Sequence, residues 1–267
     1  MFSKLTAYIR HDALTAASYK VRLLMSLGGL AVGAVPLYFV ANALQPMMAP
    51  RIEGQGTYYF SFVLIGLAAQ QFVMAASDAL PRAISEGLRT GTLEAVFVTR
   101  THVAVIVSGM MSFRFLWAML QAFVLIAVGL LFGVTLAGGS LLPALFIVSL
   151  IAAAYVPFGL IAGALHLTFR SAGPLPLVIA AGSGLLGGVY YPTDVIPSWI
   201  QHVSALVPLT YGLRALRRML LEGVGVQAVL GELMMLALLF FTLLALSVFV
   251  FHRALLHARR SGTLGQY

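Results

Sequence analysis

The feature that most constrains this chain is its series of long apolar runs. Several of them reach or exceed the roughly 20 residues that a helix needs to cross a bilayer. Of the 267 residues, 61% are hydrophobic and only 9% are charged, which is too little charge for the surface of a soluble domain of this length. The short alternating segments of a transmembrane β-barrel do not occur. The fold class is therefore predicted to be all-α, a polytopic membrane protein.

Six transmembrane helices are predicted from the apolar runs and from the polar, proline- or glycine-containing turns between them. Their approximate limits are residues 21–44, 58–80, 103–134, 141–169, 175–191 and 226–251. The first 20 residues mix apolar and charged side chains, which predicts an amphipathic helix in the membrane interface; the alternative is a frayed helical leader with no special role. Gln70, Gln71 and Asp78 make the second span too polar to face lipid, so it is expected to face the protein interior. Residues 1–267 are expected to form a single transmembrane domain.

The net charge of +8 is explained by membrane orientation rather than by nucleic-acid binding. Six spans place both termini on one side. Eleven basic residues lie on that side: Lys4, Arg10, Lys20, Arg22, Arg82, Arg89, Arg100, Arg170, Arg253, Arg259 and Arg260. Four lie on the other side: Arg51, Arg214, Arg217 and Arg218. Because positive charge gathers at the cytoplasmic ends of membrane helices, both termini are expected in the cytoplasm. The chain is expected to lie among the lipids of a bacterial cell (inner) membrane.

The sequence carries no motif for chemistry of its own. The ATP-binding pattern GxxxxGK[ST] is absent, and the only lysines, Lys4 and Lys20, follow no glycine-rich loop. The six histidines fall at span ends without the spacing of a metal site, and cysteine is absent. Acidic residues near the middle of a span, which are typical of ion-coupled transport, are also missing. The chain is therefore predicted to hold no cofactor or metal, to be no enzyme, and to receive its energy from a partner.

The segment over residues 81–101 is predicted to contact that partner. Gly91 is a candidate N-cap, and Glu94 at the third helical position favours the positive start of a helix. Leu93, Val96 and Phe97 are spaced so that they share one face. A short helix with a small apolar face suits insertion into a groove on another protein. The alternative is an ordinary turn that contains a single helical coil.

The stretch over residues 187–218 is unusual because prolines, aromatics and three arginines stand between two apolar segments. Pro197 and Pro208 predict the starts of two short helices, over residues 198–205 and 209–222. In the second, the three arginines are expected on one face and Leu213, Leu216 and Leu220 on the opposite face. Neither helix is long enough to span, so a re-entrant pair beside a pathway is predicted. The alternative is a surface pair that only braces the last span.

These two segments resemble the permease subunits of type-2 ATP-binding-cassette (ABC-2 type) exporters. The residues that carry the resemblance are EGLRTGTLEAVFVTRT, residues 86–101, and GGVYYPTDVIPSWIQHVSALVPLTYGLRALRRMLLEG, residues 187–223. The second is the more specific: an aromatic–Pro turn is followed by Ile-Pro-x-Trp, then by Pro-Leu-Thr-Tyr and an arginine a few residues on. The six-span plan and the length agree with the family across the whole chain.

The resemblance implies a coupling helix over residues 86–99 that docks on a separate ATPase, and re-entrant helices over residues 194–222. It implies an interface helix before the first span. Two permease copies, expected to be a homodimer, would enclose the substrate path, and two ATPase copies would bind ATP and Mg. The patterns favour an amphiphilic drug, antibiotic or lipid-like substrate, with a polysaccharide or glycolipid exporter as the alternative.

Two sets of functional residues are predicted. The residues expected to couple the chain to the ATPase are Glu86, Leu88, Leu93, Glu94 and Phe97. The residues expected to line the substrate path are Gln70, Gln71, Tyr190, Tyr191, Trp199, Tyr211 and Arg214. In the path, the aromatics would flank an amphiphile and Arg214 would meet an anionic head group. The alternative for the same residues is an interfacial aromatic belt with a snorkelling arginine.

Two other functional classes are alternatives to an ATP-driven permease. A self-sufficient secondary transporter or channel predicts acidic residues near the middle of the membrane. A membrane-embedded enzyme acting on lipids predicts a His/Asp or Ser/His pair at one depth. The positions of these residue types in the sequence supply neither arrangement.

Overall fold

The computed structural model describes residues 20–92, 103–137, 141–169 and 173–260, and these residues form helices and connecting turns, without strands. The helices are α2 (Lys20–Met48), α3 (Tyr59–Arg89), α5 (Val103–Leu131), α6 (Leu141–Phe169), α7 (Leu175–Leu186), α8 (Ser198–Ser204), α9 (Pro208–Glu222) and α10 (Leu230–Arg260). Three short 3-10 turns accompany them: η1 (Ala49–Arg51), η3 (Thr193–Val195) and η4 (Val226–Val229). The predicted interface helix over residues 1–20 lies almost entirely outside the described residues.

Five of the described helices are long and apolar enough to cross a membrane. They correspond to predicted spans one, two, three, four and six, so the prediction of a polytopic all-α membrane protein is confirmed. The predicted fifth span differs: α7 has only 12 residues and ends at Leu186, and Tyr190 and Tyr191 lie in the turn beyond it. At 1.5 Å per residue, such a helix covers roughly 18 Å, well short of the hydrocarbon core.

Helix α3 is the central helix of the bundle. It packs against α2, α5, α6, α7 and α9, and 78% of its most apolar stretch is buried, a larger share than in the other long helices. This confirms the prediction that the second span faces protein. The helix does not end at Leu80 as predicted, because it continues through Pro81 to Arg89. The polar residue Asp78 is accommodated by an ion pair with Arg82, one turn along the helix.

Small residues let α3 and α6 approach closely. A Cβ added at Gly159 of α6 would lie 2.3 Å from the carbonyl oxygen of Ala76 in α3. One turn further on, a Cβ at Gly163 would lie 2.9 Å from Leu80 Cδ2. Contacts of this kind are a common way for membrane helices to gain packing energy, since lipid tails are as apolar as the helices themselves.

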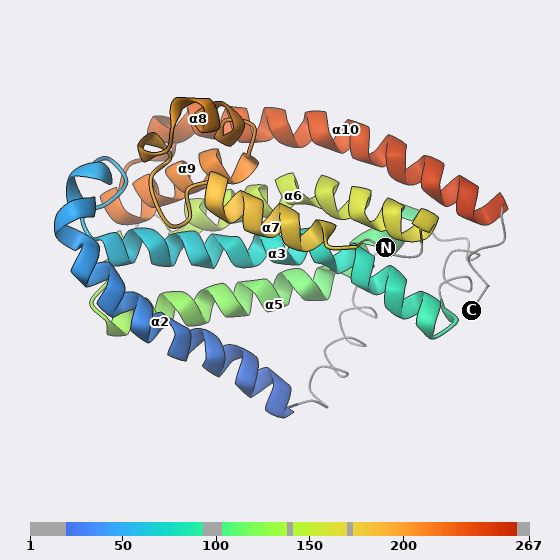
Figure 1. Cartoon of the computed structure of the whole chain (residues 1–267), viewed down its shortest axis with the longest axis horizontal. Coiled ribbons are helices and arrows are strands. Elements are labelled where there is room, and N and C mark those ends of the chain that lie inside the picture. The colour runs from blue at the N-terminus through green and yellow to red at the C-terminus, as the bar shows by residue number, and fades with distance from the viewer. Residues whose placement is uncertain (1–19, 93–102, 138–140, 170–172, 261–267) are drawn as a thin grey trace.

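The bundle has two distinct ends (Figure 1). At one end lie the turn between α2 and α3 and the whole segment between α7 and α10, including α8 and α9. At the other end lie the last turns of α3 and the C-terminal part of α10. The helix α3 therefore links the end with α8 and α9 to the end where the predicted ATPase contact begins.

We predict that Gly159→Ala lowers the free energy of unfolding of the purified protein by about 1–3 kcal/mol, and with it the melting temperature, because the new Cβ forces α6 away from the α3 backbone. The matched control is Gly182→Ala in α7, where no atom lies within 4 Å of an added Cβ. The control is expected to be neutral or slightly stabilising. Unfolding in detergent, followed by the loss of the monodisperse species on heating, measures both variants. Equal effects of the two substitutions would contradict the close contact.

Candidate functional site

The segment between α7 and α10, residues 187–229, is named here the α7–α10 connection. It contains η3, α8, α9 and η4. Both predicted short helices are confirmed: α8 follows Pro197, and α9 begins at Pro208, where the missing N–H costs nothing. Helix α9 ends at Gly223, whose φ of 70° is in the left-handed region that favours glycine. The two prolines therefore divide the connection as the sequence predicted, and Gly223 ends its second helix.

The prediction for the three arginines of α9 is wrong for Arg217. Arg217 does not share an exposed face with Arg214 and Arg218, because it is 1% exposed and is the largest fully buried side chain of the described residues. Its position explains this. It comes four residues after Leu213, so it points to the same side of the helix as the buried Leu213, Leu216 and Leu220.

The buried guanidinium of Arg217 is held by backbone carbonyls and an aromatic ring. Its Nε donates a hydrogen bond to the carbonyl oxygen of Phe62 in the first turn of α3, at 3.0 Å. Its Nη2 donates to the carbonyl oxygen of Val189 in the connection, also at 3.0 Å. The guanidinium carbon lies 3.3 Å from the centre of the Phe62 ring, a cation–π contact. We call this arrangement the Arg217 clamp: Phe62, Gly66, Val189 and Arg217.

A glycine of α3 makes room for the clamp. A Cβ at Gly66 would lie 2.7 Å from the Val189 carbonyl oxygen and 2.8 Å from Arg217 Nη2. Either distance is too short for a real side chain, so Gly66 lets the guanidinium and the loop reach the helix. Burial lowers the pKa of the Arg217 guanidinium well below its ordinary value, which reflects the cost of removing this charge from water.

A second set of contacts holds the same loop against α3. The hydroxyl of Tyr59 donates a hydrogen bond to the carbonyl oxygen of Tyr190, at 2.6 Å. The backbone N–H of Tyr59 donates to Oε1 of Gln45 in α2, at 2.6 Å. The start of α3 is therefore tied both to the loop after α7 and to the end of α2.

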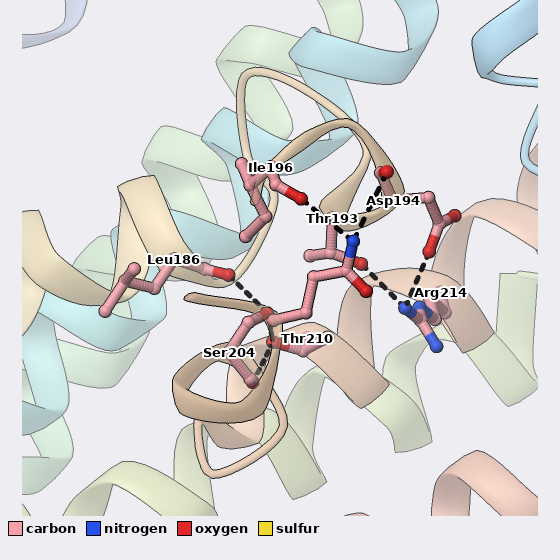
Figure 2. A network of polar contacts seen from close by, with 8 residues as sticks. Leu186, Thr193, Asp194, Ile196, Ser204, Thr210 and Arg214 are labelled. Carbon is pink, nitrogen blue, oxygen red and sulfur yellow. Dashed lines mark hydrogen bonds and ion pairs between the residues drawn. The ribbon is translucent and has the colours of Figure 1, made fainter. Parts of the chain in front are cut away.

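Arg214 lies on the other side of α9 and lines a small polar cavity of about 120 Å³. Figure 2 shows its Nη2 donating to Thr193 Oγ1 at 2.6 Å and lying 3.6 Å from the Asp194 carboxylate. Tyr211 and Gln201 also line this cavity, so the structure brings the predicted path residues Tyr211 and Arg214 together.

A network of side-chain to backbone hydrogen bonds shapes the floor of the cavity (Figure 2). Ser204 Oγ donates to the Leu186 carbonyl oxygen at 2.7 Å, and Thr210 Oγ1 donates to the Ser204 carbonyl oxygen at 2.8 Å. Gln201 Nε2 donates to the Ile196 carbonyl oxygen at 2.9 Å. These bonds fix α8 against the end of α7 and the start of α9, so the polar rim around Arg214 is preorganised.

The remaining path residues are dispersed. Trp199 of α8 is 71% exposed, and Tyr190 is also exposed. Gln70 is buried inside the bundle, where its Nε2 donates to the Ala180 carbonyl oxygen of α7 at 2.6 Å, and its Oε1 has no partner. Gln71 makes a weak bond to Leu67 within its own helix, at 3.4 Å. The structure thus separates the two glutamines from the aromatics and Arg214.

The predicted ATPase contact is only partly described, because Leu93, Glu94 and Phe97 lie outside the described residues. Glu86 is exposed and pairs with Arg89 at 2.7 Å. Leu88 is half-buried and packs against the core rather than projecting freely. Gly91, the predicted N-cap, has a φ of 67° and follows the C-cap Thr90, so it ends α3. Among the described residues there is no cluster of His, Cys, Asp or Glu that could hold a metal ion.

Sequence reasoning missed the Arg217 clamp. The available signal was the helical position of Arg217 in the middle of the leucine face, four residues after Leu213. The aromatic ring and the carbonyls that accept its charge come from α3 and from the loop after α7, more than 25 residues away in each case. No local pattern indicates these partners.

The comparison with protein families agrees with a membrane protein built of several apolar helices. A search among curated proteins finds no match. The family described as ABC-2 type transporter matches residues 35–221, which is more than two thirds of the chain and extends from α2 to the last turn of α9. Members of this family are membrane components of ABC transporters that work with an ABC ATPase. The chain therefore belongs to the ABC-2 type transporter family and is a multi-pass membrane permease.

Proposed function

We propose that this chain is the permease subunit of an ATP-driven exporter for amphiphilic substrates such as drugs, antibiotics or lipid-like molecules. The observation that carries the substrate class is the cavity beside Arg214, which is lined mainly by polar side chains from η3, α8 and α9. Trp199, Val203 and Leu206 on and just after α8 are all exposed. Helix α8 thus supplies Gln201 and Ser204 to the polar cavity and also carries exposed apolar side chains, a combination that suits a molecule with a charged head and an apolar tail.

The chemistry of the cavity favours an anionic head group. The Arg214 side chain is only partly exposed, and its guanidinium donates one short hydrogen bond to Thr193. Its ion pair with Asp194 is long, at 3.6 Å, and the Asp194 side chain is largely in solvent. An exposed pair of this geometry contributes little, so a phosphate or carboxylate would compete with Asp194 for the guanidinium. Tyr190, Tyr191 and Tyr211 would flank the tail.

The proposed topology has six spans with both termini in the cytoplasm of a bacterial cell. Residues 173–191, which include α7, would form the fifth span as a short helix completed by the loop after it. Helices α8 and α9 would re-enter the outer leaflet. The position of both at the end of the bundle that carries the α2–α3 turn supports this side assignment, because that turn is also predicted to lie outside (Figure 1).

The proposed energy source is a pair of ABC ATPase subunits that bind ATP and Mg, so this chain itself holds neither cofactor nor metal. Glu86, Leu88, Leu93, Glu94 and Phe97 would form the contact with the ATPase. The apolar side chains would fill a groove, and the two acids would pair with basic groups beside it. A second copy of this chain would complete the substrate path in a homodimer. Residues 1–267 of each copy would form a single transmembrane domain.

The substrate proposal predicts that Arg214→Gln weakens the response to an anionic amphiphile. Dodecyl phosphate is expected to stimulate ATP hydrolysis by the reconstituted complex, and the variant is expected to need at least about ten times more of it, because a charge-assisted hydrogen bond is worth about 1.5–3 kcal/mol. Dodecanol, which has the same tail without the charge, should not distinguish the two proteins.

The control for that experiment is Arg51→Gln, which removes an exposed positive charge at the same end of the bundle. It should leave the dodecyl phosphate response unchanged. An equal loss in both variants would indicate general attraction of the anion to positive charge, and an unchanged response of Arg214→Gln would refute the head-group assignment.

The coupling proposal predicts that Leu93→Asp abolishes transport while the chain still inserts into the membrane. A carboxylate on the groove-filling face loses its hydration when the ATPase docks, at a cost of several kcal/mol. We expect that the ATPase no longer copurifies with the variant, while the amount of the variant in the membrane fraction stays normal. Thr92→Asp adds the same charge at an exposed neighbouring position and should retain the ATPase. Normal transport by Leu93→Asp would exclude this segment as the contact.

A further inference from the structure

The Arg217 clamp joins three separate parts of the chain. The arginine comes from α9, one acceptor comes from the first turn of α3, and the other comes from the loop after α7. A fork of donors that reaches carbonyls on two segments fixes the position of both segments relative to α9. The bond from Tyr59 to the Tyr190 carbonyl lies beside it and holds the same loop to the same helix.

The choice of arginine at this buried position has no explanation in packing alone. Leucine or methionine would fill the space between α9 and α3 without the cost of burying a charge. Within the described part of the chain, no carboxylate lies within ion-pair distance of Arg217, so its charge is met by carbonyl dipoles and the face of the Phe62 ring. What the arginine adds is a fixed geometry between three segments.

Helix α3 extends this geometry to the opposite end of the bundle. It is unbroken from Tyr59 to Arg89, a length of about 45 Å at 1.5 Å per residue. The clamp acts on Phe62 in the first turn of α3, and Glu86, which is part of the proposed ATPase contact, lies in its last turn. The helix is also the most buried of the long helices, so it is restrained along its length.

We infer that Arg217 is a positioning residue for transport, which makes the α7–α10 connection move with α3 when the ATPase displaces the far end of α3. The inference rests on the proposed function in placing the ATPase beside Glu86, and its test uses the proposed pair of permease copies; it does not depend on the substrate. Helix α3 and the α7–α10 connection then move together. ATP binding at one end of the bundle therefore changes the position of α8 at the other end.

The absence of cysteine from the chain allows a direct test by spin labelling. In the ATPase-bound complex, one label replaces Arg82 on the exposed side of α3 (Arg82→Cys), and in a second sample one replaces Trp199 on α8 (Trp199→Cys). Electron–electron distances between the two copies are measured without nucleotide and after trapping with ATP and vanadate. We expect the distance to shift at both positions in the otherwise unchanged protein.

The decisive variant is Arg217→Lys, which keeps the charge but cannot reach both carbonyls with a planar fork. We expect the shift at residue 82 to persist and the shift at residue 199 to fall by at least half. Arg218→Lys is the matched control in the same helix, because Arg218 pairs with the Glu232 side chain of α10 at 2.8 Å and touches no part of α3 through that bond. It should leave both shifts intact.

The outcomes separate this inference from the proposed function. A full shift at residue 199 in Arg217→Lys, and also in the more severe Arg217→Gln, would overturn the inference. A merely structural role would lower the melting temperature and diminish the shifts at residues 82 and 199 together, and this result would equally overturn it. If nucleotide moves neither position in the unsubstituted protein, the ATPase coupling itself fails, whatever the variants do.

Discussion

The arrangement of this permease depends on one buried charge. The guanidinium of Arg217 is buried and forms no ion pair with a carboxylate of the described residues, so its stability rests on two carbonyl bonds and one aromatic ring. Hydrogen bonds to charged groups are worth about 1.5–3 kcal/mol each, and a desolvated cation–π contact about 2 kcal/mol. Loss of these partners would leave an uncompensated buried charge, at a cost of about 3–5 kcal/mol. The start of α3, the loop after α7 and α9 must therefore stay together.

This constraint gives the two sides of α9 different roles. Its buried side carries Arg217 and the leucines, and it fixes the helix to α3 and α6. Its other side carries Arg214 and Tyr211, which border the polar cavity with Thr193 and Asp194. A head-group site needs side chains held in place by a rigid support, and the clamp together with the Ser204 and Thr210 bonds supplies that support.

Most of the fold follows from patterns that are local in the sequence. The long apolar runs predicted the five long helices, and Pro197 and Pro208 predicted the starts of α8 and α9, because proline restricts the backbone wherever it occurs. Two local predictions failed. Pro81 did not end α3, since tertiary packing around Ala79, Leu80 and Ile84 outweighs its missing hydrogen bond. Helix α7 is shorter than the predicted fifth span, since the chain turns at Gly187 and at Gly188, where φ is 83°.

The site was less predictable than the fold. Tyr211 and Arg214 meet in one cavity because they are three residues apart on α9, a spacing that the sequence shows. Gln70 and Gln71 do not join them, because α3 places these residues about two turns further along the bundle than the clamp. The partners of Arg217 lie on distant segments, and only the packed structure brings Phe62 and Val189 to it.

The claim that a separate ATPase drives this chain is tested most directly by purifying the full chain from its own cell membrane in mild detergent. We predict that a P-loop ATPase copurifies in equal amount, and that vanadate-sensitive ATP hydrolysis drives amphiphile movement after reconstitution. A pure preparation of this chain that moves the same amphiphile without any ATPase would contradict the account.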